Sequence, residues 1–388
     1  MAIPSTVKKS AFSSLKLNLI ILVGVILEFT IIIGVYTYPE DTPTLDLIVT
    51  IHDQKIKTVS TSAESLVQNT SISKAVNKAW FTSSDRTVKF LFIGDMMFDR
   101  RVAERMRTTN SFNYPFDKIC GKEKCLFDEW DFTIANLEGP VTAKRLPPVK
   151  DLDFAFDPKI AQVLKTTGID AVSLANNHAS DQGRAGLSDT YKNLKSAGVP
   201  FFGDEVADDS SISTAILEKD STRIALVGFN VTDNPLDEKA AKDSVLKATA
   251  MADFTMIFIH WGQEYTAKPD QDQIKLAHEF LDWGADAVIG SHPHWMQSIE
   301  VYNGKPIVYS LGNFIFDQDW SVETNYGLTV GLSFSDKLNR LDLMPIKIIN
   351  SQPELLTGTE RQTRLDHLSE ISDKTLAEQI EKGIVDLK

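Results

Sequence analysis

Short apolar runs alternate with amphipathic segments from residue 88 onward. The runs are rich in β-branched and aromatic residues and are bounded by polar or glycine-containing stretches, which is typical of buried strands. We expect strands at 88–94, 132–136, 170–176, 223–230, 254–260 and 286–290. Segments 183–198 and 270–284 have the spacing of helices. Strands that alternate with helices predict an α/β domain with largely buried sheets.

The pattern changes after residue 298 to β-rich runs without helices between them. The Asn303-Gly304 pair between two such runs predicts a hairpin, and 327–349 reads as another antiparallel pair. We expect these strands to form a second sheet packed on the first, which gives two sheets flanked by helices. The end of the chain, 368–388, is predicted to be a closing amphipathic helix.

A long apolar stretch lies near the amino terminus, at residues 17–38, with Glu28 as its only charge. It is long enough to cross a bilayer as a single helix in contact with lipid. Lysines precede it and acidic residues follow it, so the positive-inside rule places 1–16 in the cytoplasm and the rest of the chain outside. A cleaved signal peptide is the alternative, but the stretch is longer than such a peptide and no small-x-small site follows it.

Residues 39–87 differ from the rest of the chain because serine and threonine are frequent. We interpret them as a stalk with one short helix between residues 62 and 80. The globular domain is predicted to span 88–350, with a C-terminal segment at 351–388. Cys120 and Cys125 fit an oxidising exterior and form either a local disulfide or two free thiols.

The 388-residue chain carries a net charge of −13, which argues against nucleic acid as a partner because that binding needs clustered lysine and arginine. The same net charge does not exclude an anionic substrate, which responds to local charge.

Polar side chains fall at or just after the carboxyl ends of the predicted strands. In open α/β sheets this edge is where ligands gather. Each residue has a structural alternative: a lone histidine often only forms hydrogen bonds, and a carboxylate there can cap a helix or face solvent. The coincidence at several strands favours a common site. The candidates are Asp95, Glu138, Asn177, His178, His260, His292 and His294.

His292 and His294 flank a proline in "SHPH". Pro293 is expected to hold this segment extended, which places both imidazoles on one face. Together with aspartate, glutamate, asparagine and a third histidine, they form a ligand set that suits two borderline divalent metals such as Mn, Fe or Zn.

Three further residues are candidates for chemistry beside such metals. His178 can donate a proton to a leaving group, and Asp181, three residues later, is the candidate that orients it. Arg100 can bind an anionic substrate through its forked guanidinium, or it can be an arginine on a helix surface.

The sequence resembles the capsule-synthesis protein family involved in poly-γ-glutamate capsule formation, which is similar to the calcineurin-like metallophosphoesterases. The resemblance runs through residues 90–318 and implies a metallophosphatase-like fold for the domain at 88–350. The matching stretches are "GDMMFDRRV", "NLEGPVT", "SLANNHASDQG", "IHWGQEY" and "GADAVIGSHPHWMQSIEVYNGKPIVYSLGNFIFDQ".

The resemblance also implies roles for the candidate residues in a dinuclear site. Glu138 would bridge the two metals. One metal would be held by Asn177, His260 and His292, the other by Asp95 and His294, with His178 as the acid. The phosphoesterases usually have histidine two residues after the first aspartate, where this chain has Met97, and they have a bridging aspartate instead of Glu138.

Two functions follow from this resemblance. In the first, the chain is a membrane-anchored hydrolase that acts on a phosphoester or amide bond while an anionic surface polymer such as poly-γ-glutamate is made or exported. In the second, it is a non-catalytic component that binds the polymer or the membrane subunits of a synthase or exporter. Retention of the ligand set together with His178 and Asp181 favours the first.

Overall fold

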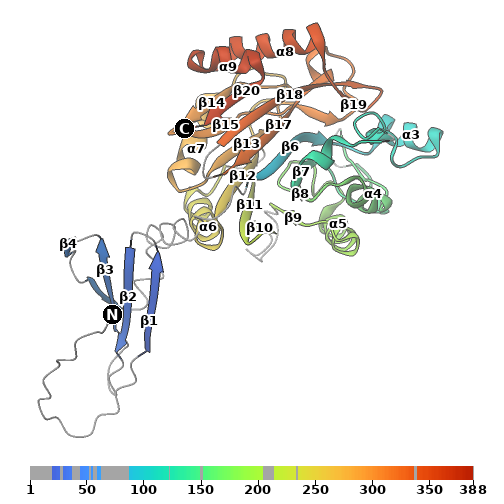
Figure 1. Cartoon of the computed structure of the whole chain (residues 1–388). Coiled ribbons are helices and arrows are strands. Elements are labelled where there is room, and N and C mark those ends of the chain that lie inside the picture. The colour runs from blue at the N-terminus through green and yellow to red at the C-terminus, as the bar shows by residue number, and fades with distance from the viewer. Residues whose placement is uncertain are drawn as a thin grey trace, which may run out of the picture. The chain divides into compact units, whose positions relative to one another are not determined.

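The computed structural model describes residues 87–387, apart from 122, 149–151, 204–213, 233–234 and 336–338, and five strands before residue 63. The chain divides into two compact units, residues 1–82 and 83–388. The second unit contains every candidate site residue (Figure 1).

The described part of the first unit is an antiparallel sheet. In place of the predicted helix over 17–38, the structure has two strands. Their sequences are rich in isoleucine and valine, residue types that are enriched in strands. No helix among the described residues is long and apolar enough to cross a membrane. The predicted stalk helix lies outside the described residues beyond Ser62. The strands are β1 (Ile20–Ile26), β2 (Phe29–Tyr36), β3 (Thr44–Ile51), β4 (Gln54–Lys55) and β5 (Val59–Ser62).

The second unit contains two sheets. The larger has the order β19-β18-β17-β6-β7-β8-β9, with β16 beside β6 and β20 beside β18. Its strands are β6 (Val88–Met96), β7 (Phe132–Leu137), β8 (Ala171–Ser173), β9 (Phe201–Phe202), β16 (Asn313–Ile315), β17 (Tyr326–Phe334), β18 (Asn339–Ile349), β19 (Gln352–Leu355) and β20 (Ile384–Leu387). The smaller has the order β10-β11-β12-β13-β15-β14. Its strands are β10 (Thr214–Lys219), β11 (Thr222–Asn230), β12 (Phe254–His260), β13 (Ala287–Ser291), β14 (Ile299–Tyr302) and β15 (Lys305–Val308).

The α/β class with two sheets and flanking helices is confirmed, but the partition of strands differs from the expected one. The later antiparallel strands do not form a sheet of their own. β17 pairs antiparallel with β6, and the hairpin β14–β15 extends the sheet of β11, β12 and β13. Pairing between strands distant in sequence depends on side chains that meet only in the fold, so periodicity along the chain does not reveal it.

The alternation of side chains along the strands builds three apolar layers. Phe90 and Phe92 point from β6 into a core between the two sheets, where Phe258 of β12 meets Phe92. Leu91 and Ile93 point to the outer face. That face is covered by α3 (Arg100–Thr109), α4 (Lys159–Thr167) and α5 (Gly183–Ala197), and the outer face of the smaller sheet by α6 (Glu238–Met251) and α7 (Gln271–Asp282).

The carboxyl end of the chain is not the single helix predicted over 368–388. It contains α8 (Gly358–Ile371), α9 (Ala377–Lys382) and then β20, which pairs with β18. Gly383 ends α9 in the left-handed conformation, at φ 79°, and this reverses the chain into the strand. Four 3₁₀ turns complete the described elements: η1 (Tyr114–Phe116), η2 (Leu126–Glu129), η3 (Glu323–Asn325) and η4 (Lys374–Leu376).

The predicted hairpin is confirmed. Tyr302 pairs with Lys305 across the turn, and both central residues have positive φ, 51° at Asn303 and 77° at Gly304. A two-residue turn of this type needs such angles, which asparagine and glycine adopt most easily.

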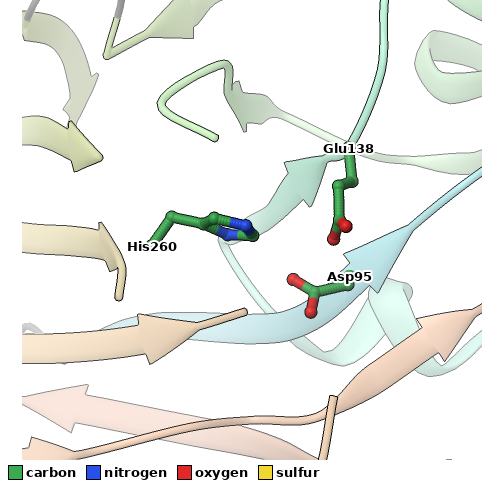
Figure 2. A group of neighbouring side chains, drawn as sticks. All are labelled: Asp95, Glu138 and His260. Atoms are coloured by element: carbon green, nitrogen blue, oxygen red, sulfur yellow. The ribbon is translucent and has the colours of Figure 1, made fainter. Parts of the chain in front are cut away.

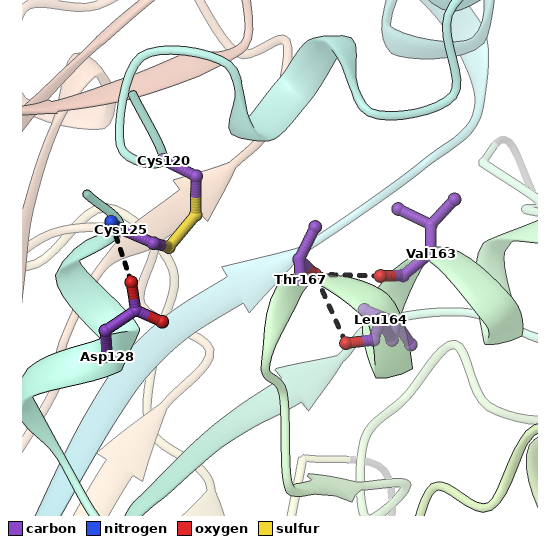
Figure 3. Close-up of a disulfide and its surroundings, with 6 residues drawn as sticks. All are labelled: Cys120, Cys125, Asp128, Val163, Leu164 and Thr167. Carbon is purple, nitrogen blue, oxygen red and sulfur yellow. Dashed lines mark hydrogen bonds between the residues drawn. A yellow bond between two sulfur atoms is a disulfide. The ribbon is translucent and has the colours of Figure 1, made fainter. Parts of the chain in front are cut away.

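Cys120 and Cys125 form a disulfide that closes the loop between η1 and η2 (Figure 3). Asp128 supports this loop by accepting a hydrogen bond from the Cys125 backbone N–H at 3.1 Å. Of the two alternatives left open by the sequence, the structure has the disulfide.

The strands that matter for function run parallel, so their carboxyl ends lie together. β6, β7 and β8 are parallel in one sheet, and β11, β12 and β13 in the other. β6 lies very close to the backbone just before β16, and Gly94 makes this approach possible. A Cβ at position 94 would lie only 1.9 Å from the Gly312 carbonyl oxygen. The close approach places Asp95 opposite Asn313 of β16.

Candidate metal centre

The predicted ligands converge, and both sheets contribute. The larger sheet provides three of them from β6 and from the segments that follow β7 and β8, and the smaller sheet provides the histidines from β12 and the loop after β13. The prediction of one sheet edge was therefore incomplete: the site lies where corresponding ends of two facing sheets meet. The first group is Asp95, Glu138 and Asn177, and the second is His260, His292 and His294.

Asp95, Glu138 and His260 form the centre of the cluster. One ligand atom from each lies within 4.8 Å of the other two, and all three side chains are fully buried. Figure 2 shows the two carboxylates and the imidazole directed toward one another. The alternative that Asp95 caps a helix is wrong, because Asp99 caps α3.

Two more histidines and an amide surround this centre. His260 Nε2 lies 3.0 Å from Asn177 Oδ1 and 3.1 Å from His292 Nδ1. His294 Nδ1 lies 3.4 Å from Asp95 Oδ2, and its Nε2 lies 3.9 Å from Glu138 Oε1. The whole ligand set predicted from the sequence thus occupies one buried region.

The path of the His292–His294 segment differs from the prediction. His292 has φ 98° and His294 has φ 57°, so the segment is a strained loop and not an extended strand end. Both imidazoles nevertheless reach the cluster, because the backbone bends at each of the two histidines. Backbone strain of this kind is retained where the surrounding structure holds it, and it concentrates at functional sites.

Burial sets the protonation of these groups. It raises the pKa of the Glu138 carboxyl well above its usual range, and the neighbouring Asp95 charge adds to this effect. It lowers the pKa of His260 well below its usual range and that of His292 to about 3, with nearby histidines as the next cause. Both imidazoles are therefore neutral near pH 7, which is the form that coordinates metal ions.

The surroundings of the Glu138 carboxyl group show whether these residues fit a metal. Its Oε1 atom is buried and accepts no hydrogen bond, whereas buried charges are normally paired or bound to a metal. A divalent cation between Glu138, Asp95 and His260 would compensate both carboxylates. The oxygen and nitrogen donors suit Mn, Fe or Zn, so the residues present fit a metal.

Asn136 was not predicted as a site residue, although it is the last residue of the predicted strand at 132–136. Its Nδ2 lies 2.8 Å from Asp95 Oδ1 and 3.3 Å from Glu138 Oε2, and Asn176 donates a hydrogen bond to its Oδ1 at 2.9 Å. Asn136 thereby orients both carboxylates. A buried asparagine inside an apolar run was the signal that could have identified it.

Two other polar residues hold the histidines. Ser291 Oγ lies 2.9 Å from His260 Nδ1, and Asn313 Oδ1 lies 2.9 Å from His294 Nδ1. Such partners fix the orientation of ligating imidazoles and raise their basicity. Met97 takes no part in the cluster, because its side chain packs in the outer core beneath the helices.

His178 and Asp181 form the predicted pair. His178 Nδ1 lies 2.7 Å from Asp181 Oδ2, and Phe154 stacks on the imidazole with a centroid distance of 4.3 Å. The Phe154 backbone N–H donates to the same Asp181 oxygen at 2.8 Å. The carboxylate and the ring are therefore both held in place, and Nε2 is the remaining nitrogen for proton transfer.

Arg100 is not an ordinary arginine of a helix surface. It begins α3 and pairs with Asp317, and its guanidinium lies 5.1 Å from the Phe154 ring centroid and 5.7 Å from that of Phe316. These aromatic contacts bring it next to the ring that stacks on His178. Its Nε is buried and has no acceptor.

The chain has a weak structural likeness to one solved phosphatase. A phosphatase structure from Mycoplasma pneumoniae matches with a TM-score of 0.41 and 13% identity, over 71% of this chain and 92% of that one. A likeness at this level does not establish a shared activity.

Sequence relatives give a firmer result. A protein of Bacillus subtilis named PGA biosynthesis protein CapA is 29% identical over 291 residues, which cover 70% of this chain and 74% of that protein. The capsule biosynthesis protein CapA of Bacillus anthracis is 28% identical over 294 residues, 70% of each. Residues 89–318, more than half of the chain and all the site residues named above, match the family described as bacterial capsule synthesis protein PGA_cap. The chain belongs to this family of bacterial capsule synthesis proteins.

Proposed function

We propose that the chain is a metal-dependent hydrolase that acts during the making, export or anchoring of an anionic surface polymer of the poly-γ-glutamate type. The observation that carries the hydrolase proposal is the buried cluster of Asp95, Glu138 and His260, in which Glu138 Oε1 accepts no hydrogen bond. The names of the two Bacillus relatives support the role in capsule or PGA biosynthesis.

Asp95, Glu138 and His260 would hold the cation, with Asn177, His292 and His294 completing a site for two. Bound divalent metals lower the pKa of water and polarise the bond to be cleaved. The protein contributes a dry, shaped environment, since all of these ligands except the partly buried Asn177 are almost entirely buried. Asn136, Ser291 and Asn313 fix the orientation of several of them.

His178 would provide the proton for the leaving group. Asp181 accepts a hydrogen bond from the Nδ1–H group and stabilises the imidazolium, so the Nε2 proton is the one that is transferred to the departing oxygen or nitrogen. Arg100 would bind an anionic group of the substrate through its guanidinium, which also pairs with Asp317.

A hydrolysis assay tests the proposal. We expect the full-length chain to hydrolyse an aryl phosphodiester with added manganese, and the double substitution His292→Ala/His294→Ala to abolish this activity by removing two ligands. A double variant that retains wild-type turnover would contradict the proposed site.

The alternative is a component that binds polymer or partner subunits without catalysis. It is favoured by the pairing of Arg100 with Asp317, because this ion pair would have to be shared or broken before Arg100 binds a substrate anion. Bound metal with no turnover on phosphodiester, phosphomonoester or γ-glutamyl amide substrates would support this alternative.

We also propose that the second unit functions outside the cytoplasm and that the apolar segment 17–38 holds the chain at the membrane, beside the membrane subunits of a polymer synthase or exporter. The Cys120–Cys125 disulfide supports an oxidising location. We expect the chain to stay with membranes after alkaline carbonate extraction and to be digested by protease added to intact protoplasts. Release by carbonate, or protection from the protease, would contradict this location.

A further inference from the structure

A second cavity lies far from the metal centre, at the opposite end of β6. Its volume is about 290 Å³. Its lining comes from β6, η2 and the residue after it, β17, β18, α8, the end of α9 and the start of β20. Lys89, the second residue of β6, lines it, whereas Asp95 lies six residues later in the same strand. At roughly 3.3 Å per residue the two sites are about 20 Å apart. β6, β17 and β18 are neighbouring strands of the larger sheet, and α8 and α9 lie next to β18 and β20 (Figure 1).

The acidic residues of this cavity are already neutralised. Asp342 forms a forked ion pair with Arg340, with Nη2–Oδ1 at 3.0 Å and Nε–Oδ2 at 3.1 Å. Glu129 pairs with Lys124, which is not part of the lining. Lys382, a cation of the wall, pairs with Glu378 along α9 at 2.6 Å.

Lys89 and Arg361 are the two cations of the cavity lining that form no ion pair with a described residue. Among the described residues, no carboxylate lies within ion-pair distance of the Lys89 ammonium or of the Arg361 guanidinium. The chain as a whole has 53 acidic and 40 basic residues, so two cations in one cavity that form no ion pair run against its composition. They create a local positive field that attracts an anion.

The backbone near both cations is fixed, and at Arg361 it also positions the guanidinium. The Arg361 guanidinium lies against Gly383, where a Cβ would come within 2.1 Å of Nη2, so glycine makes room for it. Lys89 is anchored through its backbone N–H, which donates to Asp131 Oδ2 at 2.9 Å.

The cavity also has an apolar wall. The Trp130 ring packs over Gly331, where a Cβ would lie 1.9 Å from Cη2, so the indole is fixed against β17. Leu343 and Ile384 add aliphatic surface. The volume is near the lower limit for small-molecule sites, which suits one or two units of a flexible chain.

We propose that this cavity binds a ligand that carries carboxylates on a short aliphatic chain. The carboxylates pair with Lys89 and Arg361, and the methylene groups pack against Trp130. A segment of γ-linked polyglutamate has this chemistry; that identification rests on the proposed function, whereas the carboxylate site does not.

Calorimetric titration of the full-length chain with a γ-linked glutamate oligomer tests the proposal. We expect saturable binding that weakens with added salt, and a loss of roughly tenfold or more in affinity for Lys89→Gln and for Arg361→Gln, since each removes a charged hydrogen bond. The matched control is Lys239→Gln, the same change at an exposed lysine of α6 that pairs with Asp243. It should bind like the wild type.

The thermal unfolding of each variant is recorded to confirm that it is folded. Wild-type affinity in folded Lys89→Gln and Arg361→Gln, or an equal loss in Lys239→Gln, would overturn the proposal. Displacement of the oligomer by inorganic phosphate at equal concentration would overturn the preference for carboxylates. Metal content and hydrolysis should stay unchanged in both cavity variants, so failure here is distinguishable from failure of the proposed hydrolase.

Discussion

Asp95→Asn is expected to remove the metal-dependent part of the stability of the second unit. A ligand present at a thousand times its dissociation constant stabilises the folded state by about 4 kcal/mol. Asp95 is fully buried beside Glu138 and His260, so its substitution should reduce this effect to near zero and abolish metal-dependent hydrolysis. Thermal unfolding with manganese and with a chelator measures the difference.

The wild type should therefore show a Tm that rises with manganese and falls with chelator, whereas Asp95→Asn should show one Tm in both conditions. Asp342→Asn is the matched control, because Asp342 pairs with Arg340 at the distant cavity. It should retain the metal-dependent rise. A rise of wild-type size in Asp95→Asn would contradict the assignment of Asp95 as a ligand.

His178→Gln is expected to lower kcat by about 10²- to 10⁴-fold on substrates with a poor leaving group, because general acid catalysis contributes effects of this size. The loss should be much smaller with a nitrophenolate leaving group, which departs without a proton. Metal binding should be unchanged, since the residue that fixes His178 is Asp181, at 2.7 Å, and not a carboxylate of the metal cluster. Steady-state kinetics on paired alkyl and nitrophenyl esters measure this dependence.

His278→Gln is the control for this variant. His278 lies on α7 and pairs with Glu300 at 2.7 Å, away from the candidate site residues, so both kcat values should stay at the wild-type level. An equal loss on both esters in His178→Gln would indicate a structural role for the imidazole and contradict its role as the acid.

The sequence predicted the strands and turns around the site well, because each is short and is marked by its own apolar run or turn residues. The run at 88–94 became the first part of β6, and the hairpin at Asn303-Gly304 formed as expected. It predicted the convergence of Asp95 and His260 because both lie at the ends of buried strands, and parallel strands bring such ends together.

The remaining features depend on contacts that no local pattern encodes. Pairing of β17 with β6 divides the strands between sheets, and β20 joins β18 in place of a closing helix. Positive φ at His292 and His294 is imposed by the surrounding structure, since proline between them favoured an extended path. The role of Asn136 depends on its amide contacts with Asp95 and Glu138, and these contacts exist only in the folded chain.

Elemental analysis of the purified full-length chain tests the central claim most directly. The claim is that the buried cluster of Asp95, Glu138 and His260, with the ligands around it, holds divalent metal. We expect about two equivalents of Mn, Fe or Zn per wild-type chain and a clear loss in folded His292→Ala/His294→Ala. A folded wild-type chain that contains no divalent metal, even after incubation with manganese, would contradict the claim.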